Sequence, residues 1–226
     1  MLILPLKTRL MLAVLSFLAD VFCSSDATSV NRFLTKFLDL KASPSTSTKP
    51  DNGIVSSDIM VDRTRKLWFR LFTNTAIADV ADGGGLPIPI TVYFHGGGFA
   101  FMAANSMLYD GLCKRLAREV PATVVSVSYR LLPEHRYRSQ YEDGFDVLKF
   151  IDNPKFEGFL ASSANTKKQF FIAGGREERT KSEMKLVRTP LISVKRTDWM
   201  WKAFLPQGCN RDHQVVNVFG PNSNDI

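Results

Sequence analysis

The sequence predicts a protein of the α/β class, in which a mostly parallel sheet carries helices on both faces. Residues 88–94 and 122–129 are apolar and rich in β-branched side chains, as in strands that are covered on both sides. Between them, residues 106–119 place apolar side chains at helical spacing. A second helical pattern covers residues 140–151, and a short apolar run follows at residues 169–173. Strands that alternate with helices in this way form parallel sheets.

The N-terminal residues permit two interpretations. Lys7 and Arg9 precede an apolar stretch at residues 10–19, which is the outline of a secretory signal peptide. The stretch is too short to span a bilayer, and no small-x-small cleavage site follows it. We therefore favour a buried or amphipathic helix, keep the signal peptide as the alternative, and expect no membrane association. A further helix is expected over residues 30–40, with Ser29 as its N-cap.

The next segments change character along the chain. Residues 46–53 belong to a polar stretch without periodicity and are expected to form a linker. Residues 54–61 and 67–72 are typical of strands, and the charged residues 62–66 between them are expected to form a turn. The helix over residues 106–119 should bury one apolar face, which consists of Leu108, Leu112, Leu116 and Val120.

Composition limits the function classes. With 226 residues, of which 45% are hydrophobic, the chain can bury a sizeable core. The net charge is +7, but the basic residues are scattered, so we expect no nucleic-acid partner. Cys23, Cys113 and Cys209 lie far apart and show no metal-ligand spacing. We therefore expect no metal, no cofactor and a reducing compartment, either the cytoplasm or the nucleus.

The motif HGGGF, residues 95–99, directly follows the predicted strand over residues 88–94. Ligands of parallel sheets bind at the carboxyl ends of the strands, and this motif lies at such an end. Glycines allow close backbone approach, and two N–H groups can stabilise the oxyanion of an acyl-transfer intermediate. The alternative is a plain glycine turn, as expected for Gly83–Gly85. The apolar strand before the motif and the amphipathic helix after it favour an oxyanion hole.

Three stretches carry a resemblance to a known family: VYFHGGGFAFMAANSMLYDGLCKRLA, VVSVSYRLLPEHRYRSQYEDGFD and RTDWMWKAFLPQG. They resemble the plant carboxylesterases of the hormone-sensitive-lipase-like group of α/β-hydrolases, a group that also contains the gibberellin receptor. The resemblance runs from residue 4 to residue 226 and implies an α/β-hydrolase fold. It further implies a helical lid over residues 1–45, the N-terminal half of the hydrolase domain over residues 54–174, and a remnant of the cap and later hydrolase region over residues 175–226.

The same resemblance assigns the candidate site. It implies an oxyanion hole formed by His95, Gly96, Gly97 and Gly98, in which the last two glycines donate the hydrogen bonds. Phe99 and Tyr109 are the implied substrate-binding residues. The expected partner is a small-molecule ester or another hydrophobic ligand.

The sequence departs from the family where the chemistry would be performed. A serine hydrolase needs a nucleophile elbow, G-x-S-x-G, followed by an aspartate and a histidine. Here Gly174 is followed by GREERTKSE, which resembles a later family segment, so about 40 residues are missing by typical element lengths. The chain also stops before the family's aspartate and histidine. We expect an incomplete α/β-hydrolase fold with no triad residue retained, and we expect His135 and His213 to be structural or exposed.

The sequence supports three hypotheses about function. The first is a carboxylesterase by descent that no longer cleaves esters. The second is a non-catalytic small-molecule-binding or hormone-receptor-like protein. Receptors carry a serine in place of Gly98 and different residues in place of Arg196 and Thr197, so carboxylesterase ancestry is preferred. The third is a mis-spliced or mis-predicted product without a function of its own.

Overall fold

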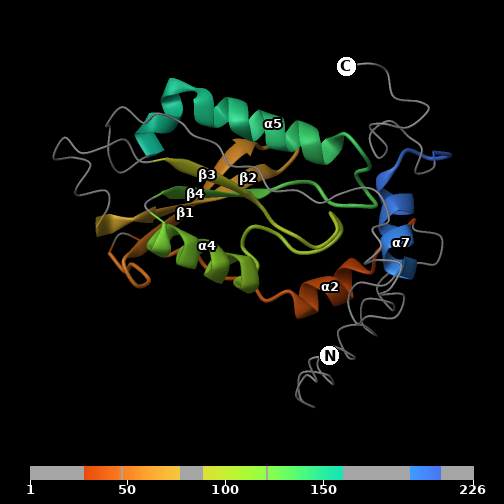
Figure 1. Cartoon of the computed structure of the whole chain (residues 1–226), viewed down its shortest axis with the longest axis horizontal. Helices are drawn as coiled ribbons and strands as arrows, with labels where there is room; N and C mark the ends of the chain where they lie inside the picture. The colour runs from red at the N-terminus through yellow and green to blue at the C-terminus, as the bar shows by residue number, and fades with distance from the viewer. Residues whose placement is uncertain (1–27, 47, 77–88, 121, 160–193, 210–226) are drawn as a thin grey trace, which may run out of the picture.

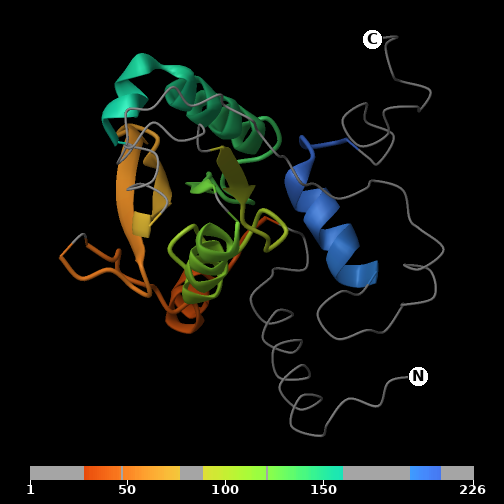
Figure 2. The ribbon, with the colours of Figure 1, turned by 60° about the vertical axis from the view of Figure 1, so that its left-hand side comes forward.

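Two helices enclose a small sheet in the computed structural model, which describes residues 28–46, 48–76, 89–120, 122–159 and 194–209. Helices α4 and α5 lie on opposite faces of the sheet (Figures 1 and 2). The described elements, in chain order, are α2 (Arg32–Leu38), β1 (Ile54–Asp62), β2 (Leu67–Asn74), β3 (Ile90–Phe94), α4 (Met107–Glu119), β4 (Thr123–Ser128), α5 (Ser139–Asp152), η1 (Pro154–Phe159) and α7 (Val194–Phe204). This arrangement confirms the predicted fold class.

The described strands form one sheet in the order β1-β2-β4-β3. Strands β3 and β4 are parallel, because α4 connects them as a crossover. Strands β1 and β2 form an antiparallel hairpin because only four residues separate them, and β2 also runs antiparallel to β4. The described sheet is therefore mixed, and its parallel part is the β3–β4 pair.

Helix α4 presents a different face to the sheet from the one that the sequence predicts. Leu108 and Leu112 are 63% and 40% exposed, whereas Asp110, Cys113 and Ala117 are buried. The cause is an ion pair beneath the helix, where the buried Arg70 of β2 donates to Asp110 Oδ1 at 2.8 Å. Because a buried guanidinium must be paired, the helix turns its carboxylate inward and leaves Leu108 and Leu112 outside. Of the predicted apolar face, Leu116 is partly buried and packs against the core.

The first described helix, α2, begins just after the buried Val30. It buries no residue, and Phe33 and Phe37 are 80% and 77% exposed. The expected N-cap at Ser29 is wrong: Asn31 caps the helix, and its side chain accepts from the Leu34 N–H at 3.2 Å. Asparagine is among the preferred N-cap residues because its short side chain reaches this donor. No helix in the described part of the chain is long and apolar enough to cross a membrane.

Helix α7, which the sequence patterns do not predict, packs against the first half of the domain. Ala203, Phe204 and Leu205 form a buried cluster with Ala100 and Leu132. The cluster brings a late segment of the chain onto the loop that follows β3. The strand expected over residues 169–173, the stretch over residues 10–19 and His213 lie outside the described residues.

Candidate functional site

The candidate site is the loop of residues 95–101, here called the glycine loop, which follows β3 at the carboxyl edge of the parallel pair. The N–H groups of Ala100 and Phe101 both donate to the Gly97 carbonyl at 3.1 Å, which folds the loop into a tight turn. Gly97 has a φ of +110°, and a Cβ there would lie 2.5 Å from the Phe101 carbonyl oxygen. The turn therefore requires glycine at position 97.

The N–H groups of Gly97 and Gly98 donate no hydrogen bond to any residue that the structure describes. Both glycines are partly exposed. Two adjacent donors without a partner are available to an external acceptor, and an oxyanion hole needs such a pair.

The histidine of the motif is built into the core. His95 is 3% exposed, and its ring stacks on Tyr129 with centroids 4.3 Å apart and an interplanar angle of 9°. Its Nδ1 donates to the Gly96 carbonyl at 2.9 Å, and the Tyr129 hydroxyl donates to the His95 carbonyl at 2.5 Å. Burial lowers the pKa of His95 to about 4, so the ring is neutral at pH 7. These contacts make His95 a support for the glycine loop.

The two predicted substrate-binding residues lie on different sides of the loop. Tyr109 comes from the first turn of α4, and its hydroxyl lies so close to Gly96 that a Cβ there would be 2.7 Å away. Phe99 instead packs between Tyr129 and Phe204, at centroid distances of 5.6 and 5.4 Å. The Phe99 ring thus anchors the loop to α7, and its substrate-binding role stays a prediction.

Sequence reasoning missed three residues that shape this site. Tyr129 supports His95, and Arg32 reaches the loop from α2. Met200 of α7 packs so closely on Gly98 that a Cβ there would lie 2.5 Å from its sulfur. No local pattern could reveal these contacts, since each joins segments far apart in the sequence.

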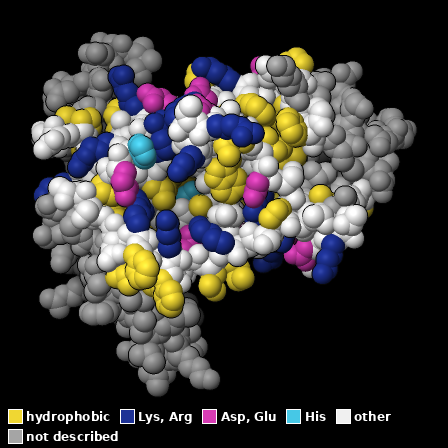
Figure 3. Space-filling model, turned by 180° about the vertical axis from the view of Figure 1, so that it is seen from behind, with side chains coloured by type: hydrophobic (Ala, Val, Ile, Leu, Met, Phe, Trp, Pro, Cys, Tyr) yellow, Lys and Arg dark blue, Asp and Glu magenta, His cyan; other side chains and the backbone are white. Residues whose placement is uncertain are grey.

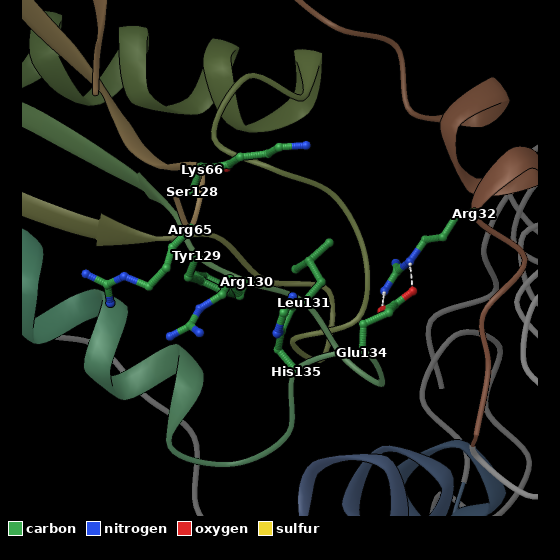
Figure 4. A pocket seen from close by; sticks show the side chains of 9 residues that line it. All are labelled: Arg32, Arg65, Lys66, Ser128, Tyr129, Arg130, Leu131, Glu134 and His135. Atoms are coloured by element: carbon green, nitrogen blue, oxygen red, sulfur yellow. Dashed lines mark hydrogen bonds and ion pairs between the residues drawn. The ribbon is translucent and has the colours of Figure 1, made fainter. Parts of the chain in front are cut away.

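A separate hollow of about 270 Å³ lies beside the segment that connects β4 to α5 (Figure 4). It is lined by Arg32, Arg65, Lys66, Ser128, Tyr129, Arg130, Leu131, Glu134 and His135. The three arginines pair with carboxylates, for example Arg65 with Asp146 at 2.7 Å and Arg130 with Asp143 at 2.9 Å. Because no residue from 95 to 101 lines this hollow, it is distinct from the glycine loop.

Two observations concern the described surface outside the glycine loop and the hollow. No group of three metal-ligating side chains occurs among the described residues. On the face shown in Figure 3, basic side chains are spread out and interspersed with acidic ones.

Comparison with known proteins relates this architecture to a group of plant proteins. A family model described as the alpha/beta hydrolase fold matches residues 91–175. The gibberellin receptor GID1C of Arabidopsis thaliana is 33% identical over 263 aligned positions, which cover 99% of this chain and 75% of the receptor. Carboxylesterase 20 of the same plant is 31% identical and covers 84% of this chain and 68% of the esterase. The structure of an ester hydrolase from the metagenome of Lake Arreo superposes with a TM-score of 0.63 at 20% identity, covering 95% of this chain and 74% of that one.

Proposed function

Because the chain belongs to the α/β-hydrolase family that contains plant gibberellin receptors and carboxylesterases, we propose that it is a member that has lost ester hydrolysis but kept an oxyanion site. One observation carries the proposal. The sequence retains HGGG at residues 95–98, yet no G-x-S-x-G occurs anywhere in its 226 residues. Without the elbow no serine is held at the point where it could attack an ester.

Two findings support an internal deletion as the cause. The match to the family model ends at residue 175, and the sequence departs from the family pattern at Gly174 and Gly175. The alignment with the gibberellin receptor spans 263 positions against 226 residues in the chain, so at least 37 positions (263 minus 226) face gaps. This number agrees with the roughly 40 residues of an elbow, its helix and the next strand.

The histidines in the described residues are poor general bases. The Nδ1 of His95 is turned to the Gly96 carbonyl and the Tyr129 hydroxyl, and no serine is among its hydrogen-bond partners. His135 is exposed in the loop before α5, where its carbonyl accepts from Gln140. When nucleophile and base are both removed, only the small contribution of binding and oxyanion stabilisation remains.

The retained donors suit a ligand with a carbonyl or carboxylate oxygen. An ester or a carboxylate can accept from Gly97 and Gly98 without being cleaved, since accepting these bonds needs no nucleophile. A non-catalytic binding role is the second candidate, and the 33% identity to a gibberellin receptor favours it. The ligand is proposed to be a small ester or hydrophobic acid other than gibberellin, because Gly98, Arg196 and Thr197 differ from the receptor pattern. The free thiols of Cys113 and Cys209 accord with a cytoplasmic or nuclear location.

Binding without turnover is tested by titrating the ¹⁵N-labelled chain with p-nitrophenyl butyrate and butyrate while p-nitrophenolate release is recorded. We expect saturable shifts of the Gly97 and Gly98 amide signals, with no release of p-nitrophenolate above the buffer rate. The amide of Gly111, which lies in α4, is the internal control and should not move. Absence of any saturable shift would refute the binding role.

The deletion itself is tested in the source tissue by mass spectrometry. The tryptic peptide QFFIAGGR, Gln169 to Arg176, spans the proposed junction. Its detection is the expected result. A peptide that continues from the same strand into a G-x-S-x-G elbow would show that the tissue makes an ordinary serine carboxylesterase instead.

A further inference from the structure

The side chain of Arg32 joins three segments that are distant in the sequence. It projects from the first residue of α2, and its Nη1 donates to the Ala100 carbonyl of the glycine loop at 2.5 Å. Its Nη2 donates to the Leu132 carbonyl, in the loop that follows β4. Nε and Nη2 also grip the two carboxylate oxygens of Glu134, at 2.8 and 2.5 Å (Figure 4). All three guanidinium nitrogens are therefore engaged, and a planar fork is well suited to this geometry.

The carbonyls that Arg32 binds belong to the framework of the candidate site. Ala100 is fully buried, and its N–H already donates to the Gly97 carbonyl. The Leu132 N–H donates to the Phe99 carbonyl at 2.8 Å, which ties the loop after β4 to the glycine loop. Arg32 thus lies across two loops that are themselves hydrogen-bonded to each other.

Polar contacts attach helix α2 to the domain, next to the buried Val30 that precedes its N-cap. It buries no side chain, and its phenylalanines point to solvent. A further attachment lies beyond its C-terminal end, where the Met107 N–H donates to the Leu40 carbonyl at 2.8 Å and the Ser106 hydroxyl donates to Asp39 at 2.9 Å. At the N-terminal end, Arg32 contributes the contacts to the glycine loop.

We propose that Arg32 is a positioning residue through which helix α2 fixes the conformation of the glycine loop. By holding the Ala100 and Leu132 carbonyls, its guanidinium keeps the turn closed around the Gly97 carbonyl and so keeps the Gly97 and Gly98 N–H groups in place. The ligand affinity of the loop therefore depends on the N-terminal segment of the chain. This last consequence rests on the proposed binding function, whereas the ordering of the loop does not.

The experiment compares amide hydrogen exchange in the unliganded full chain and in its variant Arg32→Ala. Three amides report on the loop: those of Ala100 and Phe101, which donate to Gly97, and that of Leu132, which donates to Phe99. In R32A we expect these three to exchange at least about tenfold faster, while amides of β4 keep their protection. The matched control is Arg115→Ala, which removes an arginine paired with Glu119 at 2.8 Å on the exposed face of α4 and should change none of the three.

A loop whose three amides keep wild-type exchange in R32A would overturn the proposal. If R32A instead loses protection in β4 as well, the variant Arg32→Lys distinguishes loss of the loop contacts from a general loss of stability. Lysine keeps the charge but not the fork, so the three amides alone should exchange faster, and unchanged exchange would overturn the proposal.

The p-nitrophenyl butyrate titration separates this inference from the proposed function. We expect R32A to bind the ester at least about tenfold more weakly than wild type and R115A to bind it equally well. Wild-type protein that binds no ester, together with faster loop exchange in R32A, would refute the binding function and leave the positioning role intact. Equal affinity of R32A and wild type would refute the coupling of α2 to the ligand.

Discussion

Replacement of Gly97 by alanine tests whether the glycine loop has the geometry described here. An alanine at a φ of +110° is strained by about 1–3 kcal/mol. Its Cβ would lie 2.5 Å from the Phe101 carbonyl oxygen, so the backbone must shift. That shift weakens two hydrogen bonds to the Gly97 carbonyl, each worth about 1 kcal/mol. Together these effects predict a destabilisation of about 3–5 kcal/mol.

Urea denaturation measures this loss against two control variants. Gly98→Ala should cost only about 1 kcal/mol, since its φ of +60° is left-handed helical and the atom it meets is the flexible Met200 thioether. Gly111→Ala should stabilise the chain by about 0.5–1 kcal/mol, because Gly111 lies inside α4 and an added Cβ meets nothing within 4 Å. If Gly97→Ala were as stable as wild type, or less damaging than Gly98→Ala, the loop geometry would be wrong.

Three further outcomes follow from buried charges and thiols. Burial lowers the pKa of His95 to about 4. As the pH falls from about 6.5 to about 4, the unfolded chain therefore takes up a proton at His95 that the folded chain does not. Wild type should therefore lose roughly 3 kcal/mol more than His95→Gln over that window in urea melts, and parallel pH profiles would contradict this. Burial raises the pKa of the Cys113 thiol to about 12, so iodoacetamide should label the exposed Cys209 and spare Cys113 in native protein, as peptide mass spectrometry can check. Asp110→Asn should destabilise the chain by about 2 kcal/mol in thermal melts, because it removes one of the two carboxylates paired with the buried Arg70, which keeps its pair with Asp58. A melting temperature equal to that of wild type would show that the Arg70–Asp110 pair carries no stability.

The strands and the two main helices were predictable because each carries its own periodic pattern. The predicted strand over residues 54–61 and the observed β1, Ile54–Asp62, differ by one residue, and residues 63–66 form the turn that was predicted over residues 62–66. The position of the glycine motif at the end of a strand was also readable, since an apolar run directly precedes His95. Local sequence was sufficient wherever the structure is determined by neighbours along the chain.

The sequence-based predictions fail for features that are determined by residues far apart in the sequence. The buried face of α4 could not be read from its leucines, because Arg70 on another strand draws Asp110 inward. The role of Arg32 could not be predicted from the sequence, since the three residues that accept its hydrogen bonds lie about 70 to 100 positions away. The sequence of α7 does not predict its contact with Gly98, because that contact depends on the fold of the whole domain.

The most direct test of the central claim is exposure of the purified 226-residue chain to p-nitrophenyl butyrate and, separately, to a serine-directed fluorophosphonate, with a plant carboxylesterase as the positive control. We predict that p-nitrophenolate appears at the rate of buffer alone and that the intact mass is unchanged, because no elbow serine is present to react. Hydrolysis at the rate of the control esterase, abolished by stoichiometric phosphonylation of one serine, would contradict the account.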